Sequence, residues 1–237
     1  MDLKKPEYVT GHGLIKGKSV LVTAAAGAGI GFSAASRAVE EGARGIVISD
    51  IHEGRLEAAV DKLKEETGLA EVYGKVGNVA LEDDVQALIG FADEKLGGVD
   101  ILINNAGLGT SKLLIEMEDD EWHRVIDVTL NGTMRMTRHM MKVMKARGEG
   151  GVIVNNASVL GWRAQKEQAH YAAAKAGVMA LTRCAALEAA EHNVRINAVA
   201  PSLVMHPFLH RVTTPELLAE LEGKEAFGRS ATPEEMG

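Results

Sequence analysis

The chain has 237 residues, 46% of them hydrophobic and 4% aromatic, which fits one globular α/β domain rather than a disordered or fibrous chain. Its 26 Lys and Arg against 33 Asp and Glu leave a net charge of −7, so no general nucleic-acid role is expected, because that needs a basic surface. The single cysteine, Cys184, excludes an intrachain disulfide and a multi-cysteine metal site, and we expect no metal ion and no membrane partner.

Strand-like and helix-like segments alternate after a polar stretch over residues 1–18, which lacks the apolar run of a signal peptide and favours the cytoplasm. Apolar runs predict buried strands over residues 19–23, 45–50, 71–76, 99–104, 151–155 and 194–199. Helical spacing predicts helices over residues 30–41, 55–66, 83–95, 119–147 and 171–191. This alternation predicts an α/β fold, a doubly wound parallel sheet of the Rossmann type in a single domain over residues 1–237.

A glycine-rich loop, Gly27-Ala28-Gly29-Ile30-Gly31, directly follows the first predicted strand and opens the first helix. Glycines let the backbone turn sharply and approach a pyrophosphate, and the helix N-terminus offers free N–H groups to that anion. A tight turn alone would explain an isolated glycine-rich loop. The position between a strand and a helix predicts a dinucleotide site instead.

Asp50 ends the second strand, about twenty residues further on. A carboxylate there can accept hydrogen bonds from ribose hydroxyls and would repel a 2′-phosphate, and no Arg or Lys lies between Thr23 and Ser36. We therefore expect NAD(H) rather than NADP(H), with a loop-capping aspartate as the alternative. The run 104–107, Asn-Asn-Ala-Gly, ends the fourth strand beside the same crevice, where it leaves room for a nucleoside or simply forms a turn.

Three residues with chemical potential follow the fifth strand: Ser158, then Tyr171 thirteen residues later and Lys175 four after that. Tyr171 and Lys175 share one helix face, since positions i and i+4 are neighbours. A nearby ammonium would lower the pKa of a phenol from about 10 towards neutrality. We expect Tyr171 to exchange the proton of an alcohol, Lys175 to tune it and touch the ribose, and Ser158 to hold the substrate oxygen during hydride transfer.

With these motifs, residues 14–237 resemble the short-chain dehydrogenase/reductase family. The resemblance implies an NAD(P)-dependent alcohol dehydrogenase or ketone reductase that forms homodimers or homotetramers. It implies that Ser158, Tyr171 and Lys175 are catalytic. The residues that it implies for binding the nicotinamide dinucleotide are Gly27, Gly29, Ile30, Gly31, Asp50, Asn78, Val79, Asn105, Ala106, Gly107, Tyr171, Lys175 and Pro201.

The sequence departs from the family pattern at the loop and on the long helix. Thr23 is followed by three alanines where the family has Thr-Gly, so either the loop is one residue longer or an alanine replaces the first glycine. Thr129 stands where a fourth catalytic residue, an asparagine, is usual. Asn131 lies about 200° around the helix and cannot take its place, which leaves the proton relay at that position open.

Further departures lie after the third and sixth strands and at the end of the chain. Asn78 replaces an acidic residue, and its amide oxygen could still accept from adenine. Ser202 follows Pro201 where glycine is common, and His206 stands in place of a cofactor-binding threonine. The chain ends at Gly237, before the family's last helix and seventh strand, so we expect the last strand to be missing and leave open whether the polypeptide is longer.

Four stretches resemble bacterial steroid-degradation reductases, which interconvert a ring hydroxyl and ketone on a hexahydroindene carboxyl-CoA ester: residues 11–14, 24–26, 154–165 and 170–175. The apolar side chains expected to meet the fused rings are Leu160, Trp162, Leu203, Met205, Phe208 and Leu209. The basic side chains expected to meet CoA phosphates are Arg163, Lys166, His170, His206, His210 and Arg211. A scattered solvated surface would explain the basic set equally well, Trp162 also suits a core or oligomer contact, and His170 also suits a packing role.

Two other functions remain open at this point. A 3-oxoacyl-CoA or acyl-carrier-protein reductase of fatty-acid metabolism would share the motifs, although Asp50 argues against it because biosynthetic reduction generally uses NADP(H). A non-catalytic dinucleotide-binding regulator is suggested by Thr129 and the missing tail. Cys184 is expected to be buried and inert on the helix after Tyr171.

Overall fold

The computed structural model describes residues 5–206, 209 and 213–237. In this part of the chain six strands form one parallel sheet in the order β3-β2-β1-β4-β5-β6. The strands are β1 (Ser19–Val22), β2 (Gly45–Asp50), β3 (Val72–Val76), β4 (Ile101–Asn104), β5 (Gly151–Asn156) and β6 (Val194–Val199). The predicted doubly wound α/β fold is confirmed, and its six strands fall within two residues of the predicted ranges. A single domain over the whole chain stays a prediction.

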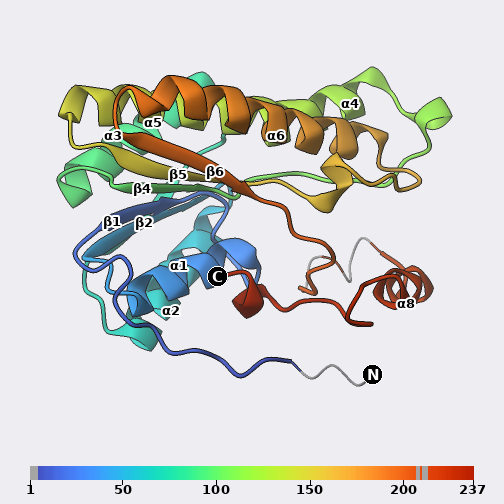
Figure 1. Cartoon of the computed structure of the whole chain (residues 1–237), viewed down its shortest axis with the longest axis horizontal. Helices are drawn as coiled ribbons and strands as arrows, with labels where there is room; N and C mark the ends of the chain where they lie inside the picture. Colours follow the sequence, from blue (N-terminus) through green and yellow to red (C-terminus); the bar gives the residue numbers. More distant parts are fainter. Residues whose placement is uncertain (1–4, 207–208, 210–212) are drawn as a thin grey trace.

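Helices cover both faces of the sheet (Figure 1). One face carries α1 (Ile30–Glu40) and α2 (Glu53–Thr67). The other carries α3 (Glu82–Leu96), α4 (Asp119–Ile126), α5 (Gly132–Arg147) and α6 (Ala169–Ala190). The described residues also form α8 (Pro215–Gly223) and the short helical turns η1 (Leu114–Glu116), η2 (Asp127–Asn131), η3 (Val159–Gly161) and η4 (Pro233–Glu235). No helix within the described ranges is long and apolar enough to span a bilayer.

Strand β1 shows why both faces need helices. All four of its residues are buried, and successive side chains of a strand point to opposite faces. Leu21 packs in the core under α3, α5 and α6, whereas Val20 and Val22 pack in the core under α1 and α2. A strand with apolar residues on both faces is stable only between two helical layers, so the continuous run predicted this arrangement correctly.

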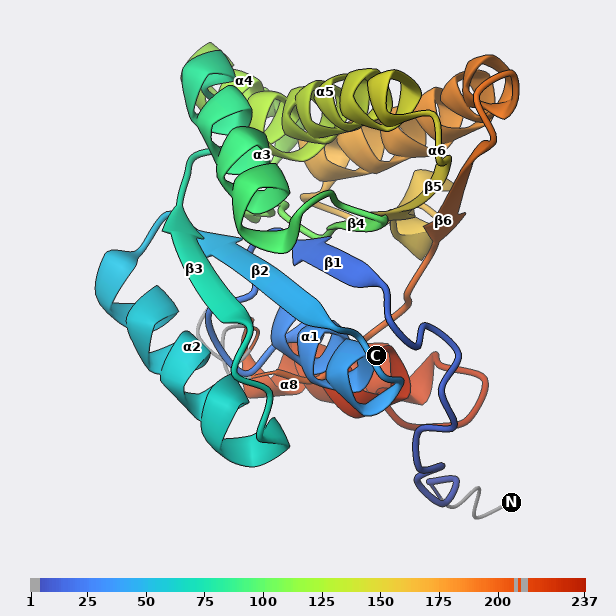
Figure 2. The same ribbon diagram turned by 90° about the vertical axis from the view of Figure 1, so that its left-hand side faces the viewer.

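The order of the strands places a crevice at the middle of the sheet. β1 pairs with β2 on one side and with β4 on the other, so the chain changes direction of winding between them (Figure 2). In open α/β sheets, ligands bind outside the carboxyl ends of the strands at such a switch point. The glycine-rich loop follows β1, and the run 105–107 follows β4, at this position.

Buried amides brace the sheet just below the crevice. Asn104 on β4 pairs in register with Asn155 on β5 and donates to its Oδ1 at 2.9 Å. Asn104 also donates to Thr137 of α5, and Asn155 donates to Thr182 of α6. Because a buried amide is costly unless it is hydrogen-bonded, these bonds fix the two strands to the helices above them.

The helix predicted over residues 119–147 has the right bounds but is not a single α-helix, and the prediction that Cys184 is buried is wrong. The helix expected over residues 119–147 is divided by a π-helical turn, η2 (Asp127–Asn131), in which the Gly132 N–H bonds five residues back to Asp127 O. Cys184 is exposed rather than buried. Helix α6 buries the stripe that contains Thr182 and Ala185, and Cys184 lies between these positions on the outer face.

Candidate active site

The structure brings Ser158, Tyr171 and Lys175 together at the carboxyl end of β5. Ser158 caps η3, where its Oγ accepts the Leu160 N–H at 3.2 Å. A side-chain hydrogen bond joins Ser158 to the half-buried Tyr171, and Lys175 Nζ lies 5.5 Å from the centroid of the Tyr171 ring. A serine, a tyrosine and a lysine far apart in the sequence therefore share one small polar site.

Lys175 is almost completely buried, with 3% of its surface exposed. Its Nζ donates to the main-chain oxygen of Asn156 at 2.5 Å. Burial lowers the pKa of Lys175 to about 8, because removing the ammonium from water disfavours the charged form. At neutral pH the side chain is still predominantly an ammonium, so it places a positive charge at the site.

The expectation that Lys175 lowers the pKa of the Tyr171 phenol is wrong for this structure. Burial raises the pKa of Tyr171 to about 12, and the hydrogen bond with Ser158 only partly opposes this effect. A phenolate at this position would be a poorly solvated anion, and Lys175 Nζ donates a hydrogen bond to the carbonyl oxygen of Asn156. At neutral pH Tyr171 is therefore a neutral phenol, which is the form that gives a proton to a substrate oxygen.

The glycine-rich loop fits a pyrophosphate. A Cβ on Gly31 would lie 2.5 Å from both Ala24 O and Asn105 Nδ2, so only glycine allows this close approach of helix and loop. Gly27 has a φ of 146° and open space beside it, and Gly29 at the start of α1 also faces open space. Helix α1 has no side-chain cap, which leaves its first N–H groups for an anion.

The turn after β4 holds the glycine-rich loop in place. Thr23 Oγ1 accepts the N–H groups of Asn105 and Ala106, each at 3.0 Å. The Asn105 amide in turn donates to Thr23 O and Ala24 O. Ala24 has a φ of 51°, in the left-handed region that favours glycine. This backbone favours the interpretation that Ala24 replaces the first glycine after Thr23.

Asp50 faces this loop from the end of β2. Its carboxylate accepts N–H groups from Ala26 and His52, the latter at 3.1 Å. Burial raises the pKa of Asp50, and Arg55, 3.6 Å away, acts in the opposite direction. Arg55 was not predicted as a site residue, because a cation for a 2′-phosphate was expected only between Thr23 and Ser36.

The other predicted cofactor residues also follow the ends of strands. Asn78 Oδ1 accepts the Ala80 N–H at 3.0 Å, so the amide oxygen expected to meet adenine already closes a turn. Val79 is buried and packs against Gly132, whose added Cβ would lie 2.7 Å from it. Gly107 lies beside Lys175, since an added Cβ would be 3.5 Å from Nζ, and Pro201 O accepts the Val159 N–H.

Thr129 lies fully buried in the π-helical turn, facing the strand-β4 turn. Its hydroxyl accepts the Leu108 N–H at 3.0 Å and donates to the Leu108 carbonyl oxygen at 3.1 Å. Asn131 is instead bonded to Asp127, as its place around the helix predicts. Thr129 therefore fixes the backbone after Gly107, and its single hydroxyl hydrogen is used in doing so.

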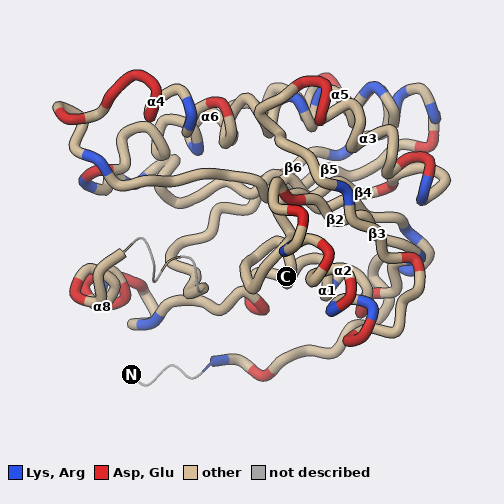
Figure 3. Tube along the Cα trace, turned by 180° about the vertical axis from the view of Figure 1, so that it is seen from behind, with Lys and Arg blue, Asp and Glu red and all other residues tan. Residues whose placement is uncertain are grey.

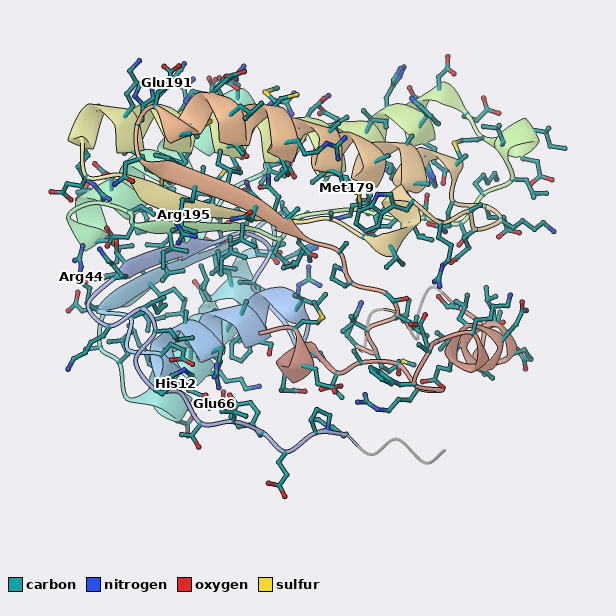
Figure 4. All side chains as sticks on the ribbon, in the orientation of Figure 1. His12, Arg44, Glu66, Met179, Glu191 and Arg195 are labelled. Carbon is teal, nitrogen blue, oxygen red and sulfur yellow. The ribbon has the colours of Figure 1, made fainter. Side chains whose placement is uncertain are left out.

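The residues expected to contact substrate are only partly brought together. Trp162 is 74% exposed and lines a shallow groove with Met179 and Ala200. Met179, labelled in Figure 4, lies on α6. The catalytic trio does not line this groove. Leu160, Leu203, Met205 and Leu209 are partly buried, and Phe208 lies outside the described residues. The apolar wall therefore stays a prediction.

The basic set expected to meet CoA phosphates is partly wrong. His170 is completely buried, so it cannot contact a phosphate in solution. Arg163 pairs with Glu225 at 3.5 Å, whereas Lys166 is exposed. His206 is described, but His210 and Arg211 lie outside the described residues. Basic segments are spread over several elements and alternate with acidic ones (Figure 3), which fits an ordinary solvated surface.

A parallel sheet with a glycine-rich loop at its switch point and a serine, tyrosine and lysine beside it defines a dinucleotide-dependent oxidoreductase. Residues 18–216 match the family described as short chain dehydrogenase. The chain belongs to the short-chain dehydrogenase/reductase family, and it is an oxidoreductase whose family binds a nicotinamide dinucleotide.

Individual relatives narrow the comparison. A Mycobacterium tuberculosis protein named (5R,7aS)-5-hydroxy-7a-methyl-1-oxo-2,3,5,6,7,7a-hexahydro-1H-indene-carboxyl-CoA reductase is 53% identical over 98% of this chain and 87% of its own length. A 3-oxoacyl-[acyl-carrier-protein] reductase from Thermotoga maritima is 34% identical over 94% of this chain and 88% of its own. A crystal structure of a Mycobacterium smegmatis short chain dehydrogenase has a TM-score of 0.86 and 52% identity, covering 98% of this chain and 88% of that one.

Proposed function

We propose that the protein interconverts a ring hydroxyl and a ketone on a bicyclic CoA ester of steroid catabolism, with NAD(H) as cofactor. The observation that carries the substrate class is the 53% identity to a relative named as a reductase of a hexahydroindene carboxyl-CoA ester. The 34% identity to a 3-oxoacyl reductase is much lower over a similar share of the chain. The roles of Ser158, Tyr171 and Lys175 in this reaction are part of the proposal.

In the direction of reduction, Ser158 donates a hydrogen bond to the ketone oxygen and holds it beside Tyr171. Tyr171 gives its phenolic proton to that oxygen as negative charge develops on it, since the phenol is neutral below its pKa of about 12. A nicotinamide dinucleotide bound in the crevice supplies the hydride that the carbonyl carbon receives. Lys175 stabilises the phenolate left behind, because its ammonium lies 5.5 Å from the ring.

The remaining cofactor residues hold the dinucleotide. Gly27, Gly29 and Gly31 leave room for the pyrophosphate at the first N–H groups of α1. Four further residues contribute only backbone or packing positions around the crevice: Asn78, Val79, Ala106 and Pro201.

NAD(H) rather than NADP(H) is the cofactor in this proposal. Two features support NAD(H). Asp50 presents a carboxylate beside the glycine-rich loop, and the cation next to it, Arg55, is already paired with that carboxylate. A 2′-phosphate would meet this carboxylate before it met the arginine. We also propose a cytoplasmic homodimer or homotetramer, on the family resemblance.

Initial rates separate the proposal from its alternatives. The absorbance of NADH or NADPH is followed with a hexahydroindene-dione carboxyl-CoA ester and with acetoacetyl-CoA. The proposal predicts the highest kcat/KM for the bicyclic ester with NADH. Faster turnover of acetoacetyl-CoA with NADPH would favour the 3-oxoacyl reductase. Tight NADH binding in calorimetry without turnover of either ester would favour the regulator.

A further inference from the structure

Three side chains outside the catalytic trio, one buried and two half-buried, form a hydrogen-bonded series that we call the triplet: His170, Thr110 and Glu121. His170 lies in the first turn of α6 beside Tyr171 and has no exposed surface. Its Nε2 is 2.8 Å from Thr110 Oγ1, and Thr110 Oγ1 is 2.7 Å from Glu121 Oε1. The triplet thus joins the start of α6 to the loop after β4 and to α4.

The bonding capacity of these groups fixes the tautomer of His170. A hydroxyl carries one hydrogen, and Thr110 donates its hydrogen to Glu121 Oε1. Thr110 Oγ1 must then accept from His170, which places the imidazole proton on Nε2. His170 Nδ1 is buried with no hydrogen-bond partner among the described residues, so a second proton there would be both charged and unpaired.

Further hydrogen bonds join segment 109–112, which the triplet holds, to the residues at the start of α6. Gln168 Nε2 donates to Thr110 O at 2.9 Å and to Ser111 Oγ at 3.1 Å. The Lys112 N–H donates to the carbonyl oxygen of Glu167, which keeps an unfavourable left-handed φ of 67°. Strain of this kind persists only where the surrounding bonds over-determine the backbone.

Segment 109–112 also lies directly against the proposed proton donor. A Cβ added to Gly109 would be 3.2 Å from Cδ2 and 3.4 Å from Cε2 of the Tyr171 ring. The backbone of the loop therefore packs on one edge of the phenol, while Ser158 binds the side chain by its hydrogen bond. Moving the segment by a fraction of an ångström would free or displace the ring.

We infer that His170, as the neutral tautomer protonated on Nε2, is a positioning residue that holds segment 109–112 against the ring of Tyr171. The inference rests on the proposed role of Tyr171 as proton donor. Burial lowers the pKa of His170, with Glu121 acting in the opposite direction, and this agrees with a neutral imidazole at pH 7. Within the part of the chain that the structure describes, the triplet makes no side-chain hydrogen bond to the glycine-rich loop or to Asp50, so it affects the chemical step rather than cofactor affinity.

Paired substitutions test the hydrogen bonds of the triplet: one member of each pair removes the hydrogen-bonding group and the other keeps it. Thr110→Val removes the hydroxyl and Thr110→Ser keeps it. His170→Leu removes the donor, whereas His170→Gln restores an N–H close to the position of Nε2. The inference predicts that Thr110→Val and His170→Leu lower kcat at least about tenfold, a loss of about 1.4 kcal/mol, while the dissociation constant for NADH stays within about twofold.

Thr110→Ser and His170→Gln are expected to keep kcat within about threefold of wild type, because the bond to the loop survives. Folded Thr110→Val with kcat within twofold of wild type would overturn the inference. So would a loss of kcat that Thr110→Ser shares in full, because then the hydroxyl would not be the cause.

A second measurement does not depend on activity. Nitrogen-15 NMR of imidazole-labelled wild type, assigned with His170→Gln, is expected to show a protonated Nε2 and a bare Nδ1 at pH 7. An Nδ1-protonated tautomer or an imidazolium would overturn the inference even if every variant were inactive. If the wild type reduces no ring ketone with NADH, the proposed function fails, and the NMR result still decides the state of the triplet.

Discussion

Lys175 Nζ donates a 2.5 Å hydrogen bond to the main-chain oxygen of Asn156, the last residue of β5. This bond ties α6 to the strand that leads to Ser158 and holds the ammonium 5.5 Å from the Tyr171 ring. Burial lowers the pKa of Lys175 to about 8 and raises that of Tyr171 to about 12. At neutral pH Lys175 is therefore mainly an ammonium and Tyr171 a neutral phenol, which are the protonation states that the proposed ketone reduction requires.

The rate of ketone reduction is expected to fall as pH rises through about 8. Above that pH Lys175 loses its proton, and with it the charge that stabilises the phenolate formed from Tyr171. The phenol itself stays protonated up to about pH 12. The measurement is kcat at saturating NADH and substrate between pH 6 and 10. A rate that stays level across pH 8–10 would contradict the role given to the lysine.

Lys175→Met is expected to raise the thermal midpoint at pH 7 while abolishing turnover. The folded pKa of Lys175 lies below its usual 10.5, so a buried ammonium opposes folding at neutral pH. In the window from about 8 to 10.5 the unfolded state binds the extra proton, and the wild type gains stability as pH rises. The advantage of the variant should therefore shrink towards pH 10.5 in thermal melts. An advantage that grows with pH would have the wrong sign.

Asp50→Ala is expected to narrow the preference for NADH over NADPH. In the proposed function the carboxylate accepts hydrogen bonds from the ribose of NAD(H) and repels a 2′-phosphate, and its removal would leave Arg55 free to meet that phosphate. The ratio of kcat/KM for the two cofactors measures this, with Asp50→Asn as the control that keeps the shape. An unchanged ratio in Asp50→Ala would remove Asp50 from cofactor selection.

Two glycines in the loop should respond differently to alanine. Gly31→Ala puts a Cβ 2.5 Å from a backbone oxygen, so the free energy of unfolding should fall by at least about 1 kcal/mol. Gly29→Ala meets no atom within 4 Å and keeps an extended φ of −107°, so its melt should match wild type. Its added methyl group enters the pyrophosphate space, and NADH binding by fluorescence should weaken. Equal melts for both variants would contradict this account of the loop.

Much of the fold could be predicted from the sequence, because buried strands and amphipathic helices have distinct patterns of apolar residues. The sequence also located Ser158, Tyr171 and Lys175, since a spacing of four residues fixes a helix face. It could not show the π-helical turn around Thr129, because a single bond shifted from i−4 to i−5 leaves the apolar pattern unchanged. The pKa of Tyr171 also escaped it, since burial is a property of the packed site.

The triplet of His170, Thr110 and Glu121 could not be predicted from the sequence either. Thr110, Glu121 and His170 are separated by 11 and 60 positions along their two bonds, and nothing local marks them as partners. Arg55 is different, because it lies five residues after Asp50, in the first turn of α2, so its proximity to Asp50 could have been predicted from the sequence. Local spacing thus predicts residues on one element, and long-range polar partners need the packed structure.

We propose that the neutral phenol of Tyr171 delivers the proton in an NADH-dependent ketone reduction. Tyr171→Phe removes that hydroxyl and leaves the ring packed against Gly109. The most direct measurement is kcat of this variant with the bicyclic ketone CoA ester, beside its dissociation constant for NADH. A fall in kcat of about 10²–10⁴-fold with NADH affinity within about threefold is expected. A kcat within twofold of wild type would contradict the claim.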